Sequence, residues 1–515
     1  MIAAVVLLPL FFAFGNIELG TIIAVISSPS FRSIAGFTVK QALLSTFLAM
    51  IVGFPAAVHY ARSNGRLSRL LGITTYIPFF FPSISMAIGF LAVYGRNGVF
   101  NNLMSFAGLE RIQILYSLGA VLLGHVFYNA PIVILVLGNA LRRLPSDVLE
   151  SSKIDGSGRI RRLLRVELPL VTPAIINSAL LIFTYCFTSF AVVLILGGAQ
   201  FATLEVSIYM NFRLLAAPQN AVVLAVVQFV FIMLFGILIS LSEKSSSFEH
   251  GEQYLEKNRF TGIYSWLFVL FEWIPILGAL FSSFYDWTRE EFIFGRITKL
   301  FSEKLVLLGT GLANTLVNSI TLSFLAAVLT VTIAFFLSWQ ARDTSRGSRY
   351  LRIVSLIALS VTPSILAVSY LTVFGSFPVP LLLALLYIVI SLPVALNYIS
   401  GQVIGAELAF LEAAQLDGAS KLARVWYMII PFFRSTIIYA ATVVFAISMG
   451  EFGGSLILGS KDFPTFAVAI YRLNGSRYLL EARFLSSALG IIIICVVAIS
   501  RWFAQKPERS IRSTP

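Results

Sequence analysis

Runs of about twenty apolar residues recur along the whole of this chain, and each run is long enough to cross a lipid bilayer as a helix. Of the 515 residues, 58% are hydrophobic and only 12% are charged, so a water-soluble fold has too few polar residues to cover its core. The runs lack the alternation of apolar and polar residues that is typical of outer-membrane strands. The sequence therefore predicts an all-α polytopic membrane protein.

The apolar runs divide into predicted spans that are equally numerous in the two halves of the chain. In the first half we predict spans at residues 1–26, 40–61, 71–94, 114–141, 170–197 and 219–242. In the second half we predict spans at residues 263–284, 310–340, 350–374, 380–403, 432–459 and 482–504. The sequence thus predicts about 12 transmembrane helices, six in each half.

A segment of the first half is repeated, with substitutions, in the second half. Residues 190–209 read FAVVLILGGAQFATLEVSIY and residues 452–471 read FGGSLILGSKDFPTFAVAIY, an offset of 452 − 190 = 262 with ten of twenty positions identical. Self-similarity over half a chain indicates two copies of one module. We predict a first repeat at residues 1–242, a polar cytoplasmic linker at 243–260 and a second repeat at 261–515.

Six spans per repeat is an even number, so the two repeats share one orientation in the membrane and form parallel repeats about an axis along the membrane normal. Between Pro82 and Pro131 the first repeat carries an insertion, residues 94–113, whose Gly and Asn content predicts a surface loop.

Basic residues set the predicted orientation. Alternate loops and the C-terminal tail together hold 24 of the 37 Lys and Arg residues, so this side is expected to be cytoplasmic, with both termini inside. The net charge of +13 arises from these short loops rather than from one continuous patch, and we therefore expect no nucleic-acid partner.

Two long cytoplasmic loops contain the most distinctive motif; we call them loop 1 (residues 145–169) and loop 2 (residues 407–431). Each is predicted to be a short amphipathic helix, a glycine break, a second basic helix and a proline that opens the next span. The repeat offset carries three residues of loop 1 onto three of loop 2, namely Glu150, Gly156 and Pro169 onto Glu412, Gly418 and Pro431. Glycine permits the sharp reversal, and proline suits a first helical turn.

In loop 2 we expect an apolar side made of Leu408, Leu411, Ala414 and Leu416. Such a helix could rest on its own spans as an ordinary surface helix. The interpretation we favour is a helix that inserts into a groove on a cytoplasmic partner.

Loop 2 resembles the EAA loop of type I ABC importer permeases, whose form is EAA-x3-G-x9-I-x-LP. Loop 1 is a degenerate copy, because Ser151 and Ser152 stand where the motif has two alanines. The resemblance implies a set of ATPase-coupling residues: Glu150, Asp155, Gly156, Pro169, Glu412, Ala413, Ala414, Asp417, Gly418 and Pro431. Over its full length the chain resembles fused permeases with two six-span halves, a group that includes thiamine and iron(III) permeases.

The resemblance also implies partners and a mechanism. The segment Gly454-x4-Gly459 continues with Ser460 where a phosphate-binding loop requires lysine, so ATP hydrolysis is expected on a separate chain. The implied partners are two ABC ATPase subunits on the cytoplasmic side, an extracytoplasmic substrate-binding protein and the lipid bilayer of the cell (inner or plasma) membrane. The chain itself is expected to be a translocation subunit rather than an enzyme, and to bind no cofactor and no metal. Transport would proceed by alternating access, with thiamine or iron(III) favoured and another cation or an oxyanion left open.

One charge within a span is informative for the substrate pathway. Glu451 lies in the eleventh predicted span, and a carboxylate within a membrane usually faces a cavity. Its repeat mate is Ser189, and we include the adjacent Phe190 and Phe452 as candidate pathway residues. The alternative for Glu451 is a role in helix packing or gating.

Two other classes of protein remain open from the residues alone. An ion-coupled secondary transporter can also have twelve spans, but it would need ion-coupling charges, and this chain offers mainly Glu451 and Glu272 within its spans. A membrane-embedded enzyme would have few residues for catalysis, because the sequence contains only three His residues.

Overall fold

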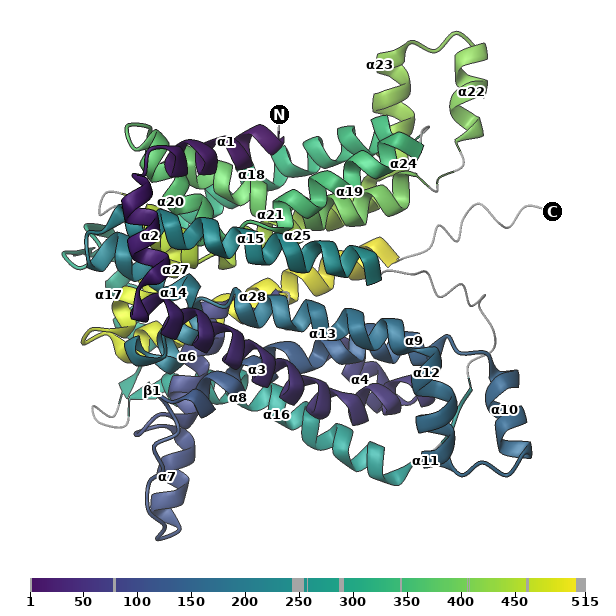
Figure 1. Ribbon diagram of the computed structural model, residues 1–515, viewed down its shortest axis with the longest axis horizontal. Helices are drawn as coiled ribbons and strands as arrows, with labels where there is room; N and C mark the ends of the chain where they lie inside the picture. The colour runs from purple at the N-terminus through teal and green to yellow at the C-terminus, as the bar shows by residue number, and fades with distance from the viewer. Residues whose placement is uncertain are drawn as a thin grey trace. The chain divides into compact units, whose positions relative to one another are not determined.

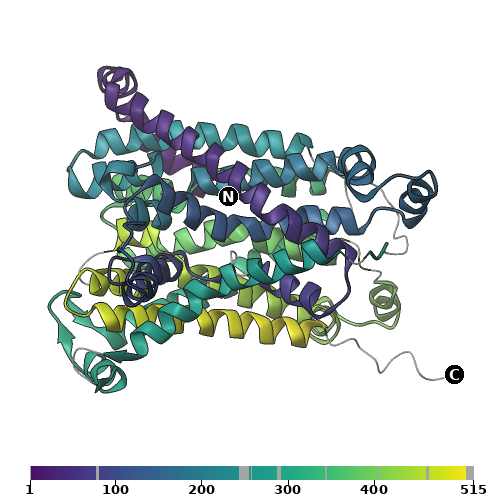
Figure 2. The ribbon, with the colours of Figure 1, turned by 90° about the horizontal axis from the view of Figure 1, so that it is seen from below.

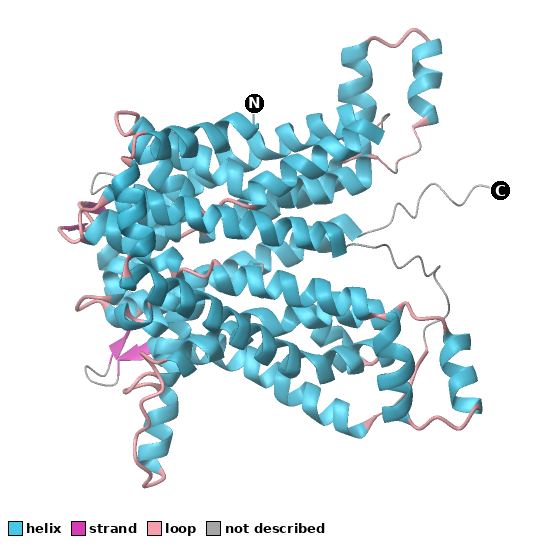
Figure 3. Cartoon of the chain, in the orientation of Figure 1, coloured by secondary structure: helices cyan, strands magenta, loops and turns pink. Residues whose placement is uncertain are grey.

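The computed structural model describes residues 2–76, 80–242, 254–256, 258–286, 291–342, 345–404, 406, 408–459 and 463–505. Helices make up most of this part of the chain, and strands occur only as two short antiparallel pairs within it (Figure 3). In these pairs Tyr285 lies opposite Phe292, and Lys304 lies opposite Gly311. The predicted all-α class is confirmed.

The elements of the first half are α1 Ile2–Gly15, α2 Leu19–Ser27, α3 Pro29–Arg62, α4 Arg66–Thr74, α6 Ser83–Tyr94, α7 Val99–Phe106, α8 Leu118–Val133, η1 Ile134–Gly138, α9 Asn139–Arg142, α10 Ser146–Ile154, α11 Arg159–Arg162, η2 Leu163–Glu167, α12 Leu168–Leu170, α13 Thr172–Phe187, η3 Val193–Gly197, η4 Ala199–Phe201, α14 Leu204–Tyr209, η5 Met210–Leu214 and α15 Pro218–Ser242. The elements of the second half are α16 Arg259–Phe284, β1 Tyr285–Asp286, β2 Glu291–Phe292, α17 Phe294–Ser302, β3 Lys304–Leu305, β4 Thr310–Gly311, α18 Leu312–Ala341, α19 Ser345–Leu359, α20 Pro363–Phe374, α21 Val379–Val403, α22 Ala409–Leu416, α23 Lys421–Arg424, η6 Val425–Ile429, α24 Ile430–Phe432, α25 Arg434–Gly450, α26 Gly453–Leu458, α27 Phe466–Asn474 and α28 Leu479–Gln505.

Seven helices among the described residues are long and apolar enough to cross a membrane, and the number reaches 11 if each of four bent helix pairs is one span. The remaining predicted span, at residues 71–94, falls on α4 and α6, with residues 77–79 outside the described residues. The polytopic architecture is therefore confirmed, and a count of about 12 helices agrees with it.

Two predicted spans are bent rather than straight. The span at 1–26 is the pair α1 and α2, which meet at 97°, and the span at 350–374 is the pair α19 and α20, which meet at 82°. Proline explains the second bend: Pro363 stands at the first turn of α20, and the Thr362 hydroxyl accepts a hydrogen bond from the Ile365 N–H at 3.3 Å.

The described chain forms two compact units. Unit 1 comprises Met1–Gly15, Leu300–Ala469 and Leu489–Pro515, and unit 2 comprises Asn16–Lys299 and Ile470–Ala488. Both units therefore contain pieces of both predicted repeats.

Unit 1 is built around α18, which packs along α21 and α25. Its core contains small residues of α18, such as Ala334, against Leu396 and Val444 of the other two helices, which allows close approach of the helix backbones. Helix α1 packs against α20 and α19, and the Tyr370 hydroxyl donates to the Val5 carbonyl at 3.4 Å. A helix of the first repeat thus completes the unit formed mostly by the second.

Unit 2 is built around α3, which packs along α8, α13 and α16 (Figures 1 and 2). Helix α16 comes from the second repeat; it packs on α6 and α3, and its Tyr264 hydroxyl donates to the Val52 carbonyl at 2.8 Å. The compact units therefore do not coincide with the predicted sequence repeats, whose boundaries at 242 and 261 stay a prediction. Of the predicted linker, residues 243–253 and 257 lie outside the described residues.

The insertion at residues 94–113 lies at the surface as predicted, but it is ordered around a helix, α7. Phe106 at the end of α7 is 94% exposed. Asn101 is fully buried and ties the two ends of the insertion together, because its side chain bonds the Gly95 carbonyl at 2.9 Å and the Ile112 N–H at 2.8 Å. In unit 2, α7 and the loop 1 helices α10 and α11 lie at opposite ends of the long helices (Figure 1).

Glycine at position 53 sets the approach of α3 to α8. A Cβ atom there would lie 2.5 Å from the Ala130 carbonyl oxygen and 2.7 Å from the Val133 Cβ. We expect Gly53→Ala to force these helices apart and to destabilise the protein by about 1–3 kcal/mol. Gly36→Ala on the same helix is the matched control, because a Cβ there meets nothing within 4 Å. Thermal unfolding of the detergent-purified variants measures the difference, and equal melting temperatures would contradict this account of the α3–α8 packing.

Candidate functional site

Loop 1 folds as α10 and α11 around Gly156. The φ angle of Gly156 is +77°, a left-handed conformation that is strained for residues with a Cβ. The N–H groups of Gly156 and Ser157 donate to the carbonyl oxygens of Lys153 at 3.0 Å and Ser152 at 3.1 Å. This pair of bonds is the Schellman pattern that ends a helix and reverses the chain.

Loop 2 repeats this geometry as α22 and α23 around Gly418. The φ angle of Gly418 is +83°, and the N–H groups of Gly418 and Ala419 donate to Gln415 at 3.1 Å and Ala414 at 2.9 Å. A Cβ added to either loop glycine would meet nothing within 4 Å, so backbone conformation and not space requires glycine here. The predicted sharp reversal is confirmed in both loops. Residue 407, where loop 2 was predicted to start, lies outside the described residues.

Both loops expose apolar side chains at equivalent positions of the repeat. Ile154 at the end of α10 is 85% exposed, and Leu416 at the end of α22 is 89% exposed. Exposed apolar residues also stand at Ile160 and Leu422, and at Leu164 and Trp426, each pair separated by the repeat offset of 262. The exposed apolar side chains of the two loops thus stand at matched positions of the repeat.

The predicted coupling residues divide between this surface and the interior. The carboxylates are exposed, together with one alanine of the motif: Glu150, Asp155, Glu412, Ala413 and Asp417. Ala414 is only 8% exposed.

The predicted apolar side of loop 2 was wrong in one respect. Leu408 is buried in the core of unit 1 and Leu411 packs against that core, so these residues hold the loop on its own helices. Ala414 is buried as well, whereas Leu416 faces solvent. The reason is that Leu416 stands two residues after Ala414, about 200° further around the helix, and so lies on the opposite face.

The two loop prolines differ from the prediction that each opens the next span. Pro169 and Pro431 stand in the three-residue turns α12 and α24, and each follows a π-helical turn, η2 or η6. The chain then bends by 74° before α13 and by 70° before α25. A π-helical turn interrupts the regular hydrogen-bond ladder, which suits a proline that has no N–H to donate. Because the bend follows the proline, the proline belongs to the short segment before α13 or α25 and does not start that helix.

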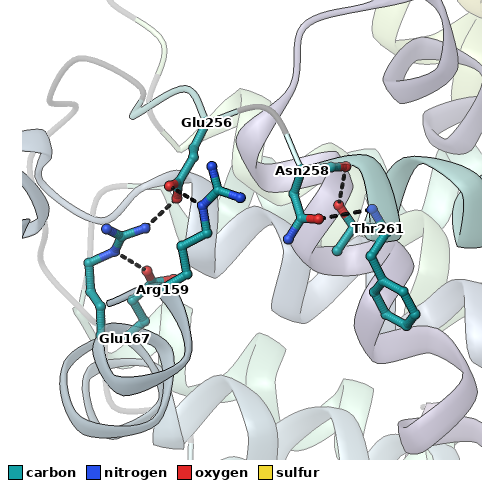
Figure 4. Close-up of polar contacts among 7 residues, drawn as sticks. Arg159, Glu167, Glu256, Asn258 and Thr261 are labelled. Atoms are coloured by element: carbon teal, nitrogen blue, oxygen red, sulfur yellow. Dashed lines mark hydrogen bonds and ion pairs between the residues drawn. The ribbon is translucent and has the colours of Figure 1, made fainter. Parts of the chain in front are cut away.

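Loop 1 is also held by a network of charged side chains (Figure 4). Arg62 at the end of α3 donates to Glu167 at 2.6 Å, and the Nε of Arg162 donates to the other oxygen of the same carboxylate at 3.2 Å. Glu256 of the linker accepts from Arg159 at 2.7 Å and from Arg162. The network joins α3, the second helix of loop 1 and the linker segment just before α16, all within unit 2.

Glu451 lies at a break between α25 and α26, where its carboxylate caps the N-terminal turn of α26. Its Oε1 accepts from the Gly454 N–H at 2.8 Å and its Oε2 from the Ser455 N–H at 2.9 Å. The Ser455 hydroxyl also donates to this carboxylate and lies 2.9 Å from the Tyr387 hydroxyl. Glu451 is 7% exposed and Phe452 beside it is 2% exposed. The geometry thus agrees with the packing alternative for Glu451, and its role in the substrate pathway stays a prediction.

The first repeat has a break at the equivalent place, between α13 and η3. Ser189 is half-buried there, and Phe190 is buried with its ring 5.7 Å from that of Tyr209. Glu272, the other carboxylate noted within a span, is fully buried, and neither of its oxygens has a hydrogen-bond partner among the described residues.

Sequence reasoning missed the charged network of loop 1. Its signal was present as four arginines within residues 159–165, followed closely by Glu167. The remaining partners, Arg62 and Glu256, lie about a hundred residues away on either side, so no local pattern could link them.

Comparison with known proteins agrees with this geometry. Residues 46–244 match the family described as "Binding-protein-dependent transport system inner membrane component". The Thiamine transport system permease protein ThiP of Brucella abortus (strain 2308) is 25% identical over 491 residues, which is 91% of this chain and 87% of the relative. ThiP of Escherichia coli (strain K12) is 24% identical over 480 residues, 89% of this chain and 86% of the relative. The Ferric transport system permease protein FbpB of Actinobacillus pleuropneumoniae is 21% identical over 510 residues, 94% of this chain and 71% of the relative.

These matches support the class inferred from the loops: over about nine-tenths of its length the chain is similar to fused, two-copy permeases of the type I ABC importers, and its apolar helices agree with a multi-pass inner-membrane protein. Within that class it resembles the thiamine and iron(III) permeases. The matched permease family implies a transport subunit rather than an enzyme.

Glu451→Gln tests whether this carboxylate stabilises the protein by capping the start of α26. Glutamine keeps the size but replaces one acceptor oxygen with an NH2 group that faces backbone N–H donors, so we expect a loss of about 1–3 kcal/mol in stability. For stability, the matched control is Ser189→Ala at the equivalent break, where we expect little change in melting temperature. Thermal unfolding and substrate uptake are measured together. Lost uptake with an unchanged melting temperature would instead assign the carboxylate to the substrate pathway.

Proposed function

We propose that this chain moves a small solute inward by alternating access, driven by two separate ABC ATPase subunits that bind loops 1 and 2. One observation carries the proposal. Both loops have the same helix–glycine–helix backbone, with φ of +77° at Gly156 and +83° at Gly418, and both expose apolar residues at equivalent positions. A pair of such knobs fits two copies of one partner, each with an apolar groove.

The path from loop to membrane supports a rigid-body mechanism. Each loop continues through a π-helical turn and a bend into a single spanning helix, α13 or α25. Each of these helices ends at the break that holds Ser189 or Glu451. When the ATPases close on ATP, they would pull both loops and thereby rock α13 and α25, which shifts the balance between inward-open and outward-open states.

The substrate we propose is thiamine or iron(III). The supporting observation is that relatives aligned over 89–94% of this chain carry the names of thiamine and ferric transport permeases. We further propose that a separate extracytoplasmic protein delivers this substrate and that both termini lie in the cytoplasm. ATP would be bound by the ATPase partners, and this chain would need no cofactor.

Reconstitution tests the proposal directly. The permease, its ATPase and its binding protein are placed in proteoliposomes, and uptake of labelled thiamine and of iron(III) is followed with and without ATP. We expect saturable uptake of one of them that depends on ATP and on the binding protein. Uptake of neither would refute the substrate assignment, and uptake driven by an ion gradient without ATP would favour a secondary transporter.

Gly418→Val tests the coupling role of loop 2. A β-branched residue is strained at φ of +83°, so we expect the reversal to distort and substrate-stimulated ATPase activity to fall at least about tenfold, with the protein still folded. Gly418→Asn is the matched control, because asparagine tolerates the left-handed region and should retain most activity. Full activity of the valine variant would exclude a coupling role for this turn.

Glu412→Ala and Glu150→Ala test whether the two loops bind equally. Both carboxylates are exposed, but only loop 2 retains the Glu-Ala-Ala sequence, so we expect Glu412→Ala to weaken ATPase association more. Pull-down of the ATPase by each variant gives the comparison. An equal or reversed loss would show that completeness of the motif does not determine binding strength.

A further inference from the structure

A described segment of the linker, Tyr254–Glu256, is bound to the end of α3. The Glu256 N–H donates to the Arg62 carbonyl at 3.1 Å. The Tyr254 ring is 8% exposed and lies 5.2 Å from the guanidinium carbon of Arg62 and 5.2 Å from that of Arg162. The linker is therefore more than a flexible connection at this point, because its backbone and an aromatic ring both make specific contacts.

Glu256 is the residue that joins this segment to loop 1. Its two oxygens accept from Arg159 and Arg162, and the Arg162 side chain is only 3% exposed. Glu167 alone would have to serve two buried arginines, Arg62 and Arg162, if the Glu256 charge were removed. A buried guanidinium that loses its partner is strongly destabilised, so the position of α11 depends on Glu256.

The linker also leads directly into a membrane helix. Asn258 follows the contact segment, and its side chain accepts from the Phe260 N–H at 3.0 Å, which starts α16 (Figure 4). The Thr261 hydroxyl donates to the Asn258 carbonyl at 3.2 Å in the same turn. Helix α16 packs along α3 and α6, so Glu256 connects loop 1 to a firmly packed helix.

Loop 2 is anchored by different means. The repeat mates of Arg159, Arg162 and Glu167 are Lys421, Arg424 and Ile429. Arg424 donates to Gln415 within loop 2 at 2.7 Å, and Ile429 is buried in the apolar core of unit 1. Among the described residues of loop 2, the anchor is therefore apolar packing rather than an ionic bridge to another segment.

We propose that Glu256 is a positioning residue: it clamps the second helix of loop 1 to α3 and to the start of α16, so that these three segments move together when the ATPase pulls on loop 1. This inference rests on the proposed coupling role of loop 1. In this proposal the linker does more than connect the two repeats covalently, because it also fixes the position of loop 1.

Glu256→Gln in the complete transporter tests the clamp. Glutamine keeps the size and removes the charge, and we expect amide hydrogen exchange of residues 159–167 to rise by roughly tenfold or more. Exchange of residues 421–429 in loop 2 should stay unchanged, which separates a local clamp from a general loss of stability. Substrate moved per ATP should fall several-fold, while ATPase association is retained through loop 2. Unchanged exchange at 159–167, or a rise throughout the chain, would overturn the proposal.

Arg159 provides a second variant that tests the ion pair itself. Its side chain is 58% exposed, so Arg159→Gln should fold normally. If the two residues act through their pair, the double variant with Glu256→Gln should transport no worse than Glu256→Gln alone. Additive losses would refute a shared role. Glu110→Gln, an exposed carboxylate in the insertion, is the matched control and should leave both exchange and transport unchanged.

A cut in the linker separates a clamp from a simple tether. A protease site inserted between Ser246 and Ser247, cleaved after reconstitution, leaves Tyr254–Glu256 attached to α16, and transport should be retained. Loss of transport on cleavage, equal to that of Glu256→Gln, would refute the clamp. The two proposals fail differently: absence of ATP-driven uptake by the wild type refutes the proposed function, whereas hydrogen exchange still tests the clamp in that case.

Discussion

A peptide group inside a bilayer has no water to bond with, and this constraint accounts for most of the structure. It explains why the described chain is helical and why strands occur only as two short pairs. It also explains the chemistry at the places where helices stop. At the break before α26 the first free N–H groups are met by the Glu451 carboxylate, and at the bend before α20 one is met by the Thr362 hydroxyl. A carboxylate that is costly in the membrane is therefore paired with two N–H groups that would otherwise lack a partner at this break.

The two repeats have kept one backbone geometry while their side chains diverged. The Schellman turns at Gly156 and Gly418 are alike in φ and in both hydrogen bonds. The anchors behind them differ, because Glu167 in an ionic network corresponds to Ile429 in an apolar core. The two loops thus share the turn geometry that we propose the ATPases recognise, whereas the contacts that hold each turn in place differ.

Sequence reasoning predicted well those features that depend on local pattern or on the repeat. The apolar runs located the spans. The glycine positions located both reversals, since a left-handed backbone conformation favours glycine and is therefore visible in the local sequence. The offset between repeats pointed to the loops. It could not reveal that α1 packs with α20 or that Glu256 binds Arg162, because these contacts join residues far apart in the chain. It also misjudged Pro169, since the π-helical turn before it depends on how the loop meets its own helices.

The exchange of α1 and α16 between the repeats constrains how the protein can be made. Unit 2 includes Ile470–Ala488, so it is complete only when nearly the whole chain has been synthesised. Helix α1 precedes its packing partners α19 and α20 by more than three hundred residues in the chain, so it is synthesised well before them. Its sequence, IAAVVLLPLFFAFG, has no charged residue, so the helix exposes no unpaired charge to lipid before its packing partners are synthesised. The order of synthesis thus places a demand on the first helix that its final surroundings do not reveal.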